Sequence, residues 1–205
     1  MTAKEVSETE CEHMVMSMEL MANHIGNVAK QFDKQSVRDM LAQILDADSI
    51  FVMGAGRSGL VGKAFAMRLM HLGFNVYVVG ETTTPAVRNN DLVVAISGSG
   101  ETRSMADLGK IAKEIGSSVV TITSNKDSTL GMMSDAVMVM PGRTKSDAGD
   151  GYLERHMRGE YSFLTPLGTS FEITSLVFLD ALVAELIAIT GSSEADLKRR
   201  HTVLE

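Results

Sequence analysis

Two glycine-rich segments contain the hydroxyl groups and the open backbone that an anionic ligand needs. The first is GAGRSG, residues 54–59, and the second is ISGSGET, residues 96–102; a short apolar run precedes each of them. Their glycines let a ligand approach the backbone amides, which form an anion-binding nest with the start of the following helix. A phosphate monoester carries a charge of about −1.5 to −2 near neutral pH and accepts several hydrogen bonds at once. These segments therefore indicate that the chain binds a phosphate group.

Nine residues of these two segments are predicted to bind the phosphorylated molecule, and four of them contribute hydroxyl groups. They are Gly56, Arg57, Ser58, Ser97, Gly98, Ser99, Gly100, Glu101 and Thr102. An alternative is that the hydroxyls only cap a helix, but capping explains one hydroxyl at a time and not three beside two glycines. Glu101 either orients a hydroxyl group of the ligand or only favours the helix N-terminus through its charge.

The first segment also has the spacing G-x-G-x-x-G, which is a weak match to the dinucleotide-binding fingerprint. Glu81 follows Gly59 by 22 positions, close to where a carboxylate that binds a ribose is expected. An NAD(P)-dependent oxidoreductase is therefore an alternative. A dinucleotide pyrophosphate needs one glycine loop, however, and gives the second loop no role, so the pair of loops favours a sugar phosphate.

The elements that must position these loops alternate along the chain, and each strand is a short apolar run. The predicted strands are 49–53, 74–79, 92–96, 117–123 and 136–140, and the predicted helices between and after them are 59–72, 102–115, 129–134 and 171–189. This order predicts a three-layer αβα sandwich with a five-stranded, mainly parallel sheet. Ligands of such sheets bind beyond the carboxyl ends of the strands, where both glycine-rich segments lie.

Residues 1–34 are predicted to form an N-terminal helical arm before a single domain of residues 35–205. Apolar residues in the arm recur at intervals of three and four, as in a coiled coil: Met18, Met21, Ile25, Val28 and Phe32. Two interpretations stay open. The helix either packs on its own domain or contacts a neighbouring subunit.

The composition excludes several classes of function. A net charge of −7 argues against a nucleic-acid partner. No uninterrupted apolar run approaches the ~18 residues of a membrane span, and the polar N-terminus resembles no signal peptide. A single cysteine, Cys11, excludes an internal disulfide and is typical of a reducing cytosol, and no histidine or cysteine spacing indicates a metal site. We expect a cytoplasmic protein without metal, nucleic-acid or membrane partners.

GAGRSG together with ISGSGET resembles the paired phosphate loops of the sugar isomerase (SIS) domain family. Further segments are similar to the 6-phospho-3-hexuloisomerases within that family: MRLMHLGFNVYVVGETTTPAV, PGRTK, TPLGTSFE, LVFLDALVAEL and RHTVLE. The resemblance runs from about residue 35 to the C-terminus. It implies the SIS fold, which is flavodoxin-like or Rossmann-like.

The resemblance implies an isomerase that interconverts D-arabino-hex-3-ulose 6-phosphate and D-fructose 6-phosphate in the ribulose monophosphate route of formaldehyde fixation, or in its reverse. It also implies that no cofactor is needed, that the protein is a homo-oligomer and usually a tetramer, and that hexulose-6-phosphate synthase is its metabolic neighbour. Two alternatives remain: another SIS sugar-phosphate isomerase, and a sugar-phosphate-binding module without catalysis, as in transcription regulators.

Moving a carbonyl between C3 and C2 of a sugar needs a base for a carbon-bound proton and an electrophile for the enediolate oxygen. Glu172 is the predicted base, because the resemblance places it at the position of the family's proposed proton acceptor. Its alternative role is structural, since Thr169-x-x-Glu172 has the spacing of a capping box. Arg57 is predicted to bind the sugar oxygens or the enediolate, unless it forms only a solvent-exposed salt bridge.

His201 is the second predicted catalytic residue, acting as an acid or base or opening the sugar ring. A histidine near a chain end is usually a surface residue, but related isomerases place a C-terminal histidine at the active site, often that of a neighbouring subunit. Arg143 and Lys145 are candidates to close over the substrate or to pair with nearby acidic residues.

Overall fold

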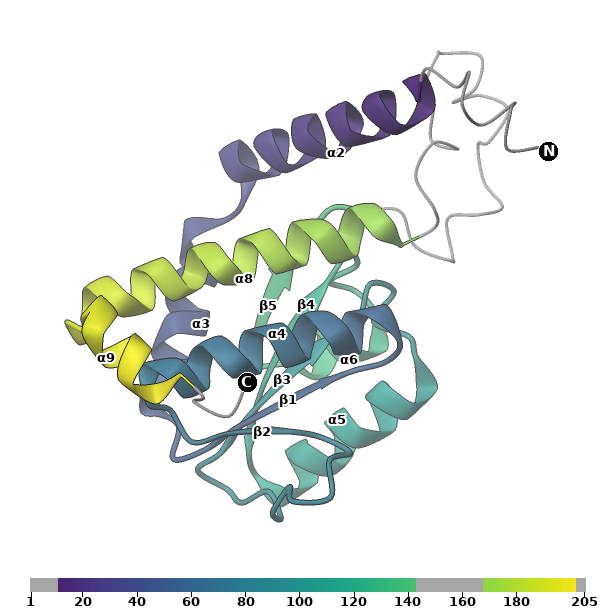
Figure 1. Ribbon diagram of the computed structural model, residues 1–205. Helices are drawn as coiled ribbons and strands as arrows, with labels where there is room; N and C mark the ends of the chain where they lie inside the picture. Colours follow the sequence, from purple (N-terminus) through teal and green to yellow (C-terminus); the bar gives the residue numbers. More distant parts are fainter. Residues whose placement is uncertain (1–10, 143–167, 202–205) are drawn as a thin grey trace.

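The structure is a computed structural model that describes residues 11–142 and 168–201. Five strands form one sheet in the order β2-β1-β3-β4-β5, and every neighbouring pair is parallel (Figure 1). The strands are β1 Ile50–Gly54, β2 Val76–Val78, β3 Leu92–Ile96, β4 Ser118–Thr123 and β5 Ala136–Val139. All five lie within one residue of the predicted bounds or inside them, so the predicted sheet is confirmed.

Helices cover both faces of this sheet. The described helices are α2 Glu12–Gln31, α3 Lys34–Asp46, α4 Arg57–Leu72, α5 Arg103–Ile115, α6 Thr129–Met133, α8 Thr169–Thr190 and α9 Glu194–Arg200. Side chains of α3, α4 and α8 form one buried core with one face of the sheet, and those of α5 and α6 form a second core on the other face. Because successive strand residues point to opposite faces, Ile50 and Val52 enter the first core while Phe51 and Met53 enter the second. The predicted αβα sandwich is confirmed.

The strand order places the two glycine-rich segments side by side. From β1 the chain first adds β2 on one side, and then returns to add β3 on the other. The crevice between two such strands is where parallel α/β sheets bind ligands. Gly54, the last residue of β1, is paired with Ile96, the last residue of β3, so both segments begin at the same level of the sheet.

α8 is the described helix that bears on the predicted absence of a membrane span. Among the described helices it alone has the length and the composition to cross a membrane, although Glu172, Asp180 and Glu185 interrupt its apolar run. The helix packs against α4 and α3, and its side chains Phe171, Leu179, Leu182, Val183 and Leu186 are buried in the first core. These contacts are those of a core helix in an α/β domain.

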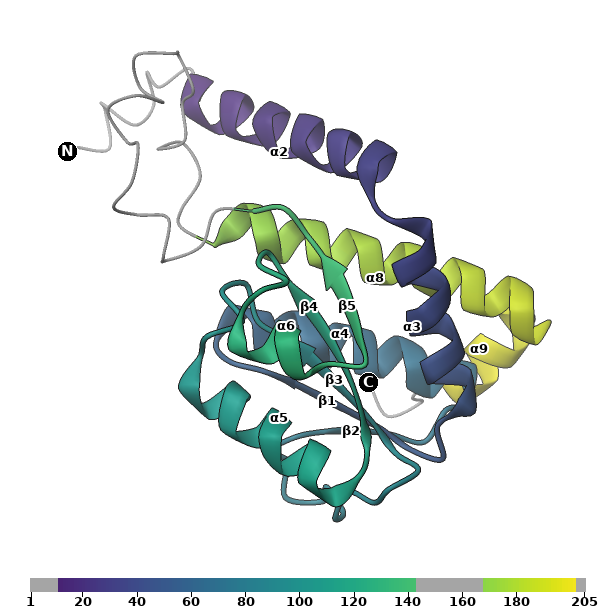
Figure 2. The same ribbon diagram turned by 180° about the vertical axis from the view of Figure 1, so that it is seen from behind.

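α2 lies along the outer side of α8, and only its C-terminal part is anchored there (Figure 2). Val28 is buried in the first core, and Phe32 meets Phe178 of α8 edge to face with ring centroids 6.4 Å apart. Towards its N-terminus the helix exposes large apolar side chains, among them Met14, Met16, Met18 and Leu20. The C-terminal part therefore packs on its own domain, as one of the two interpretations predicted.

Candidate active site

The turn between β1 and α4 needs glycine at three positions. Gly56 has φ +59° and ψ −129°, a conformation that side-chain-bearing residues rarely adopt. Gly54 and Gly59 are pressed together: a Cβ on Gly59 would lie 2.7 Å from the carbonyl oxygen of Gly54. This contact brings the end of the strand directly against the start of α4. The first helical residues, Arg57 and Ser58, are thereby placed at the carboxyl edge of the sheet.

Substituting alanine for Gly54 should damage both the fold and the site. The new Cβ would lie 2.8 Å from the backbone of Ser58, so we expect a loss of about 1–3 kcal/mol in the free energy of unfolding. We also expect weaker binding of inorganic phosphate, because the start of α4 must move. Urea unfolding and phosphate titration measure the two effects. Gly26→Ala in α2 is the matched control, since a Cβ there meets nothing within 4 Å; equal behaviour of the two variants would contradict the prediction.

The segment after β3 presents hydroxyl groups in a tight turn. Ser97 is buried, and its Oγ lies 3.4 Å from Oγ1 of Thr102. Gly100 has φ +66°, and a Cβ at this position would overlap the Ser128 side chain. Thr102 occupies the N-cap position of α5, yet its side chain makes no capping hydrogen bond. The capping alternative therefore does not account for the Thr102 hydroxyl.

Two other predicted ligands in this segment have partners within the fold. The Oγ of Ser99 accepts a hydrogen bond from the backbone N–H of Glu101 at 3.2 Å. The Glu101 carboxylate accepts hydrogen bonds from the hydroxyl of Thr129 at 2.6 Å and from its backbone N–H at 2.7 Å. These two bonds lower the pKa of Glu101 below its ordinary value, and the bond from the Thr129 hydroxyl has the larger effect. Glu101 therefore links this segment to the start of α6, a role that the sequence did not predict.

The loop between β4 and α6 supports the second glycine-rich segment, and the sequence analysis missed it. The hydroxyls of Ser124 and Thr123 both donate to the carbonyl of Gly98, at 2.7 and 3.1 Å. Ser128 caps α6 by accepting a hydrogen bond from Gly131 N–H. The available signal was a cluster of Ser, Thr and Asn at the end of the strand next to β3. Such a cluster resembles an ordinary turn, so its contact with Gly98 was not evident.

Glu172 and Arg57 meet at the same edge of the sheet. Arg57 Nε forms an ion pair with Glu172 Oε2; the Glu172 side chain is 13% exposed and that of Arg57 is 60% exposed. The contact joins the start of α8 to the start of α4, across 115 residues of sequence. The salt-bridge alternative for Arg57 is thus partly met, but its partner is the predicted base and not a remote surface residue.

The capping-box alternative for Glu172 is wrong. The N-cap residue of α8 is Gly168, at φ +88°, and Thr169 is already the first residue of the helix. Glu172 therefore has no serine or threonine cap to complement. Phe171, the residue before Glu172, fixes the orientation of the first turn of α8 because it packs on the second glycine-rich segment. A Cβ on Gly98 would lie 3.2 Å from the Phe171 ring. Glu172 is consequently held beside the predicted phosphate site.

His201 lies elsewhere in the same chain. Its ring stacks on that of His71, with centroids 4.9 Å apart, and Arg200 donates to the carbonyl of His71 at 3.1 Å. His71 is in the last turn of α4, and at about 1.5 Å per residue it is about 21 Å along the helix from Arg57. Figure 1 shows the same separation, with α9 at the end of α8 that is remote from the start of that helix. One chain thus does not bring His201 to Glu172.

Arg143 and Lys145 lie outside the described residues. Glu81, the candidate ribose ligand, accepts a hydrogen bond from Lys63 of α4 at 2.6 Å. Within residues 11–142 and 168–201, no three metal-ligating side chains of histidine, cysteine, aspartate or glutamate gather in one place.

Comparison with known proteins identifies the family. The SIS domain matches residues 43–152. An uncharacterised protein of Archaeoglobus fulgidus is 49% identical over 94% of this chain and 100% of its own length. A 3-hexulose-6-phosphate isomerase of Bacillus subtilis is 37% identical over 89% of this chain and 94% of its own. A crystal structure from Methanococcus jannaschii, from which a molecular function of 3-hexulose-6-phosphate isomerase was inferred, has a TM-score of 0.78 at 33% identity, covering 93% of this chain and 99% of its own.

These relatives also decide whether the first glycine-rich segment belongs to a sugar-phosphate enzyme or to an NAD(P)-dependent oxidoreductase. The B. subtilis protein is similar over most of both chains and is an isomerase, so the oxidoreductase alternative is set aside. The predicted sheet, the paired loops and the family resemblance agree with one another. The chain belongs to the SIS domain family, and it is an enzyme of the group named 3-hexulose-6-phosphate isomerase.

Proposed function

We propose that this chain interconverts D-arabino-hex-3-ulose 6-phosphate and D-fructose 6-phosphate through an enediol(ate) intermediate. The observation that carries the proposal is the position of Glu172, whose carboxylate lies against Arg57 at the edge of the sheet where both glycine-rich segments begin. The site thus combines a carboxylate base with a cation. The isomerisation moves hydrogen and a carbonyl within one molecule, so it is redox-neutral overall and needs no cofactor.

The phosphate is bound by the two glycine-rich segments. Ser58, Ser97, Ser99 and Thr102 donate hydroxyl hydrogen bonds, and the backbone amides at the starts of α4 and α5 donate the others. Gly56, Gly98 and Gly100 leave room for the phosphate oxygens. These contacts bind the end of the substrate that does not react. They therefore contribute mainly to affinity and to the position of the sugar carbons.

Glu172 transfers the proton between the two sugar carbons. In the direction of fructose 6-phosphate, the carboxylate removes the proton from C2 of the hexulose and a proton returns at C3. Arg57 is the electrophile that stabilises the negative charge on the enediolate oxygen. When substrate enters, the guanidinium exchanges part of its contact with Glu172 for contact with the substrate oxygens. This exchange is sterically feasible because 60% of the Arg57 side chain is exposed.

His201 completes the site from a second subunit. Within one chain it stacks on His71 at the far end of α4, so a shared site requires an oligomer. The exposed apolar side chains of α2, including Met14, Val15 and Met18, support such an oligomer because an isolated helix of this kind leaves its apolar surface in water. We infer a homo-oligomer, and a tetramer as the family resemblance implies, in the cytoplasm.

The metabolic setting is the one that the family resemblance implies. The isomerase would act next to hexulose-6-phosphate synthase in the ribulose monophosphate route, either for formaldehyde assimilation or for its reverse. Incubating the protein with fructose 6-phosphate and purified synthase is expected to release formaldehyde, which is detected colorimetrically. No formaldehyde above the level of synthase alone would contradict the proposal. A rise in melting temperature with fructose 6-phosphate, without turnover, would instead indicate a sugar-phosphate-binding module.

A further inference from the structure

His24 connects the N-terminal helix to the segment that leaves the last strand. Its Nε2 lies 2.9 Å from the carbonyl oxygen of Pro141, a residue 117 positions away. A carbonyl oxygen only accepts hydrogen bonds, so Nε2 carries the proton and donates it. Among the residues that the structure describes, this is the one hydrogen bond from a side chain of α2 to the rest of the fold.

The segment that His24 contacts is packed directly on the start of α8. A Cβ on Gly142 would lie 2.6 Å from Cα of Phe171 and 2.7 Å from its backbone nitrogen. The backbone of residue 142 thus touches the backbone of the first helical turn, with no side chain between them. Any shift of residues 141 and 142 away from α8 would remove the backbone contact that supports this first turn.

That first turn carries the proposed catalytic base. Phe171 touches residue 142 on one side and Gly98 of the phosphate-binding segment on the other. Glu172 follows it and pairs with Arg57. The contacts therefore run without interruption from His24, through residues 141 and 142, to Phe171 and the site.

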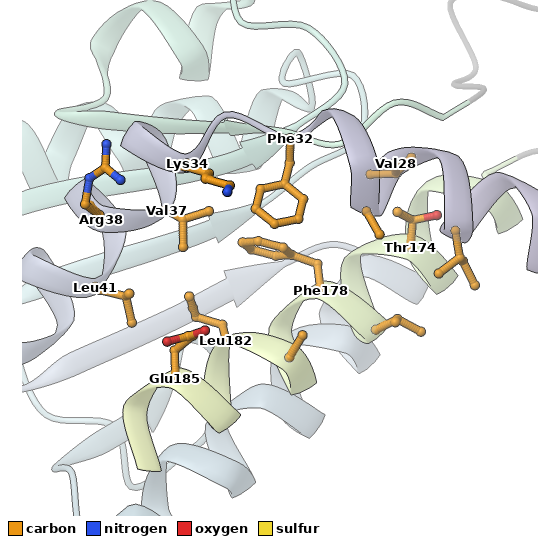
Figure 3. A pocket seen from close by; sticks show the side chains of 14 residues that line it. Val28, Phe32, Lys34, Val37, Arg38, Leu41, Thr174, Phe178, Leu182 and Glu185 are labelled. Atoms are coloured by element: carbon orange, nitrogen blue, oxygen red, sulfur yellow. The ribbon is translucent and has the colours of Figure 1, made fainter. Parts of the chain in front are cut away.

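The apolar contacts of α2 would by themselves attach this helix only loosely to the domain. Between α2, α3 and α8 there is a groove of about 420 Å³, lined by Val28, Phe32, Phe178 and Leu182, among others (Figure 3). The Phe32 and Phe178 rings meet across it. Because the groove leaves the helix incompletely packed, the hydrogen bond from His24 contributes a directional restraint that the apolar contacts do not supply.

We propose that His24 is a positioning residue of the active site. By donating to the Pro141 carbonyl it keeps residues 141 and 142 against the first turn of α8, and so fixes Glu172 relative to Arg57 and the bound phosphate. This inference rests on the proposed function, since it takes Glu172 as the base. His24 acts through Phe171 and touches no substrate.

Two substitutions separate the hydrogen bond from the bulk of the side chain. His24→Leu removes the donor, whereas His24→Gln keeps an N–H donor at a similar distance from the backbone. We expect His24→Leu to lower kcat about tenfold, since a misplacement of about 1 Å at a reacting group costs up to 10²-fold. Its KM should change less than twofold, because the phosphate contacts are untouched. His24→Gln should restore kcat to within about threefold of the unmodified protein.

His13→Leu is the matched control, since His13 is an exposed histidine of the same helix, three turns away. It should leave both constants unchanged. Unchanged kcat in His24→Leu would overturn the inference, as would equal losses in the leucine and glutamine variants. A loss that appears only in KM would also overturn it.

Hydrogen–deuterium exchange of residues 168–174 tests the inference independently of the reaction. Exchange in this first turn of α8 should be faster in His24→Leu than in the unmodified protein, and slow again in His24→Gln. Unchanged exchange in His24→Leu would overturn the positioning role. If the unmodified protein has no isomerase activity, the proposed function fails, and the exchange result still decides whether His24 positions the turn.

Discussion

Replacing Glu172 with glutamine is expected to lower kcat by about 10²–10⁴-fold, the usual contribution of a positioned general base. The amide has nearly the same size and can occupy the same place beside Arg57, but it cannot accept the proton from a sugar carbon. Binding of fructose 6-phosphate should persist, because the phosphate is held by the glycine-rich segments. Initial rates in the coupled assay give kcat, and thermal shift with fructose 6-phosphate gives the binding.

Glu185→Gln is the matched control for this prediction. Glu185 is on the same helix, α8, but it is exposed and more than three turns from Glu172. Its substitution should leave kcat unchanged. Near-full turnover in Glu172→Gln would remove the residue from the role of base. Loss of both turnover and sugar-phosphate binding would instead show that the ion pair with Arg57 is needed to form the site.

Replacing His201 with asparagine should also abolish most of the turnover, although His201 lies far from Glu172 in its own chain. The expected loss is about 10²-fold or more if the imidazole acts as an acid or base. The fold should be preserved, because His201 lies at the end of α9, where the chain is exposed. Truncation before residue 200 should have the same effect on turnover, and it should leave phosphate affinity largely intact.

A complementation experiment separates a shared site from a site within one chain. Glu172→Gln and His201→Asn chains, co-expressed with different tags, would form mixed oligomers in which one site of each mixed pair has both native residues. With random mixing, about a quarter of the native activity should return, because half of the pairs are mixed and one of their two sites is intact. No recovery in purified mixed oligomers would contradict a shared site. Full activity in His201→Asn alone would remove His201 from the mechanism.

The sheet was predictable because each strand has a local sequence pattern, a short run of apolar residues. A run such as Leu92–Ile96 is apolar throughout, since parallel strands covered on both faces need no polar side. The glycine turns were predictable for a similar reason, because positive φ at Gly56 and Gly100 requires a residue without a Cβ. The placement of both loops at one edge then followed from the alternation of strands and helices.

Contacts between remote segments were less predictable. The sequence contains a good capping box at Thr169-x-x-Glu172, but the helix begins one residue earlier than that pattern requires, and Glu172 meets Arg57. Glu101 was expected either to orient a hydroxyl group of the ligand or to favour the N-terminus of the helix that follows it, yet its partner is Thr129, at the start of another helix. Such pairs depend on how loops from different strands meet, and no local pattern encodes that.

α9 was missed for a different reason. Its seven residues include no buried side chain, so the apolar periodicity that reveals longer helices is absent. The local signal was its capping box, in which Ser193 and Asp196 bond to each other's backbone. Without α9, the position of His201 beside His71 was not foreseeable.

The position at which solvent hydrogen enters the sugar tests the central proposal most directly. Fructose 6-phosphate is incubated with the protein in D₂O and followed by ¹H NMR. Proton transfer between C2 and C3 through an enediol(ate) predicts loss of the C3 proton signal, together with new signals of the 3-hexulose 6-phosphate. An intact C3 signal without any signals of the 3-hexulose 6-phosphate, or exchange only at C1, would contradict the account.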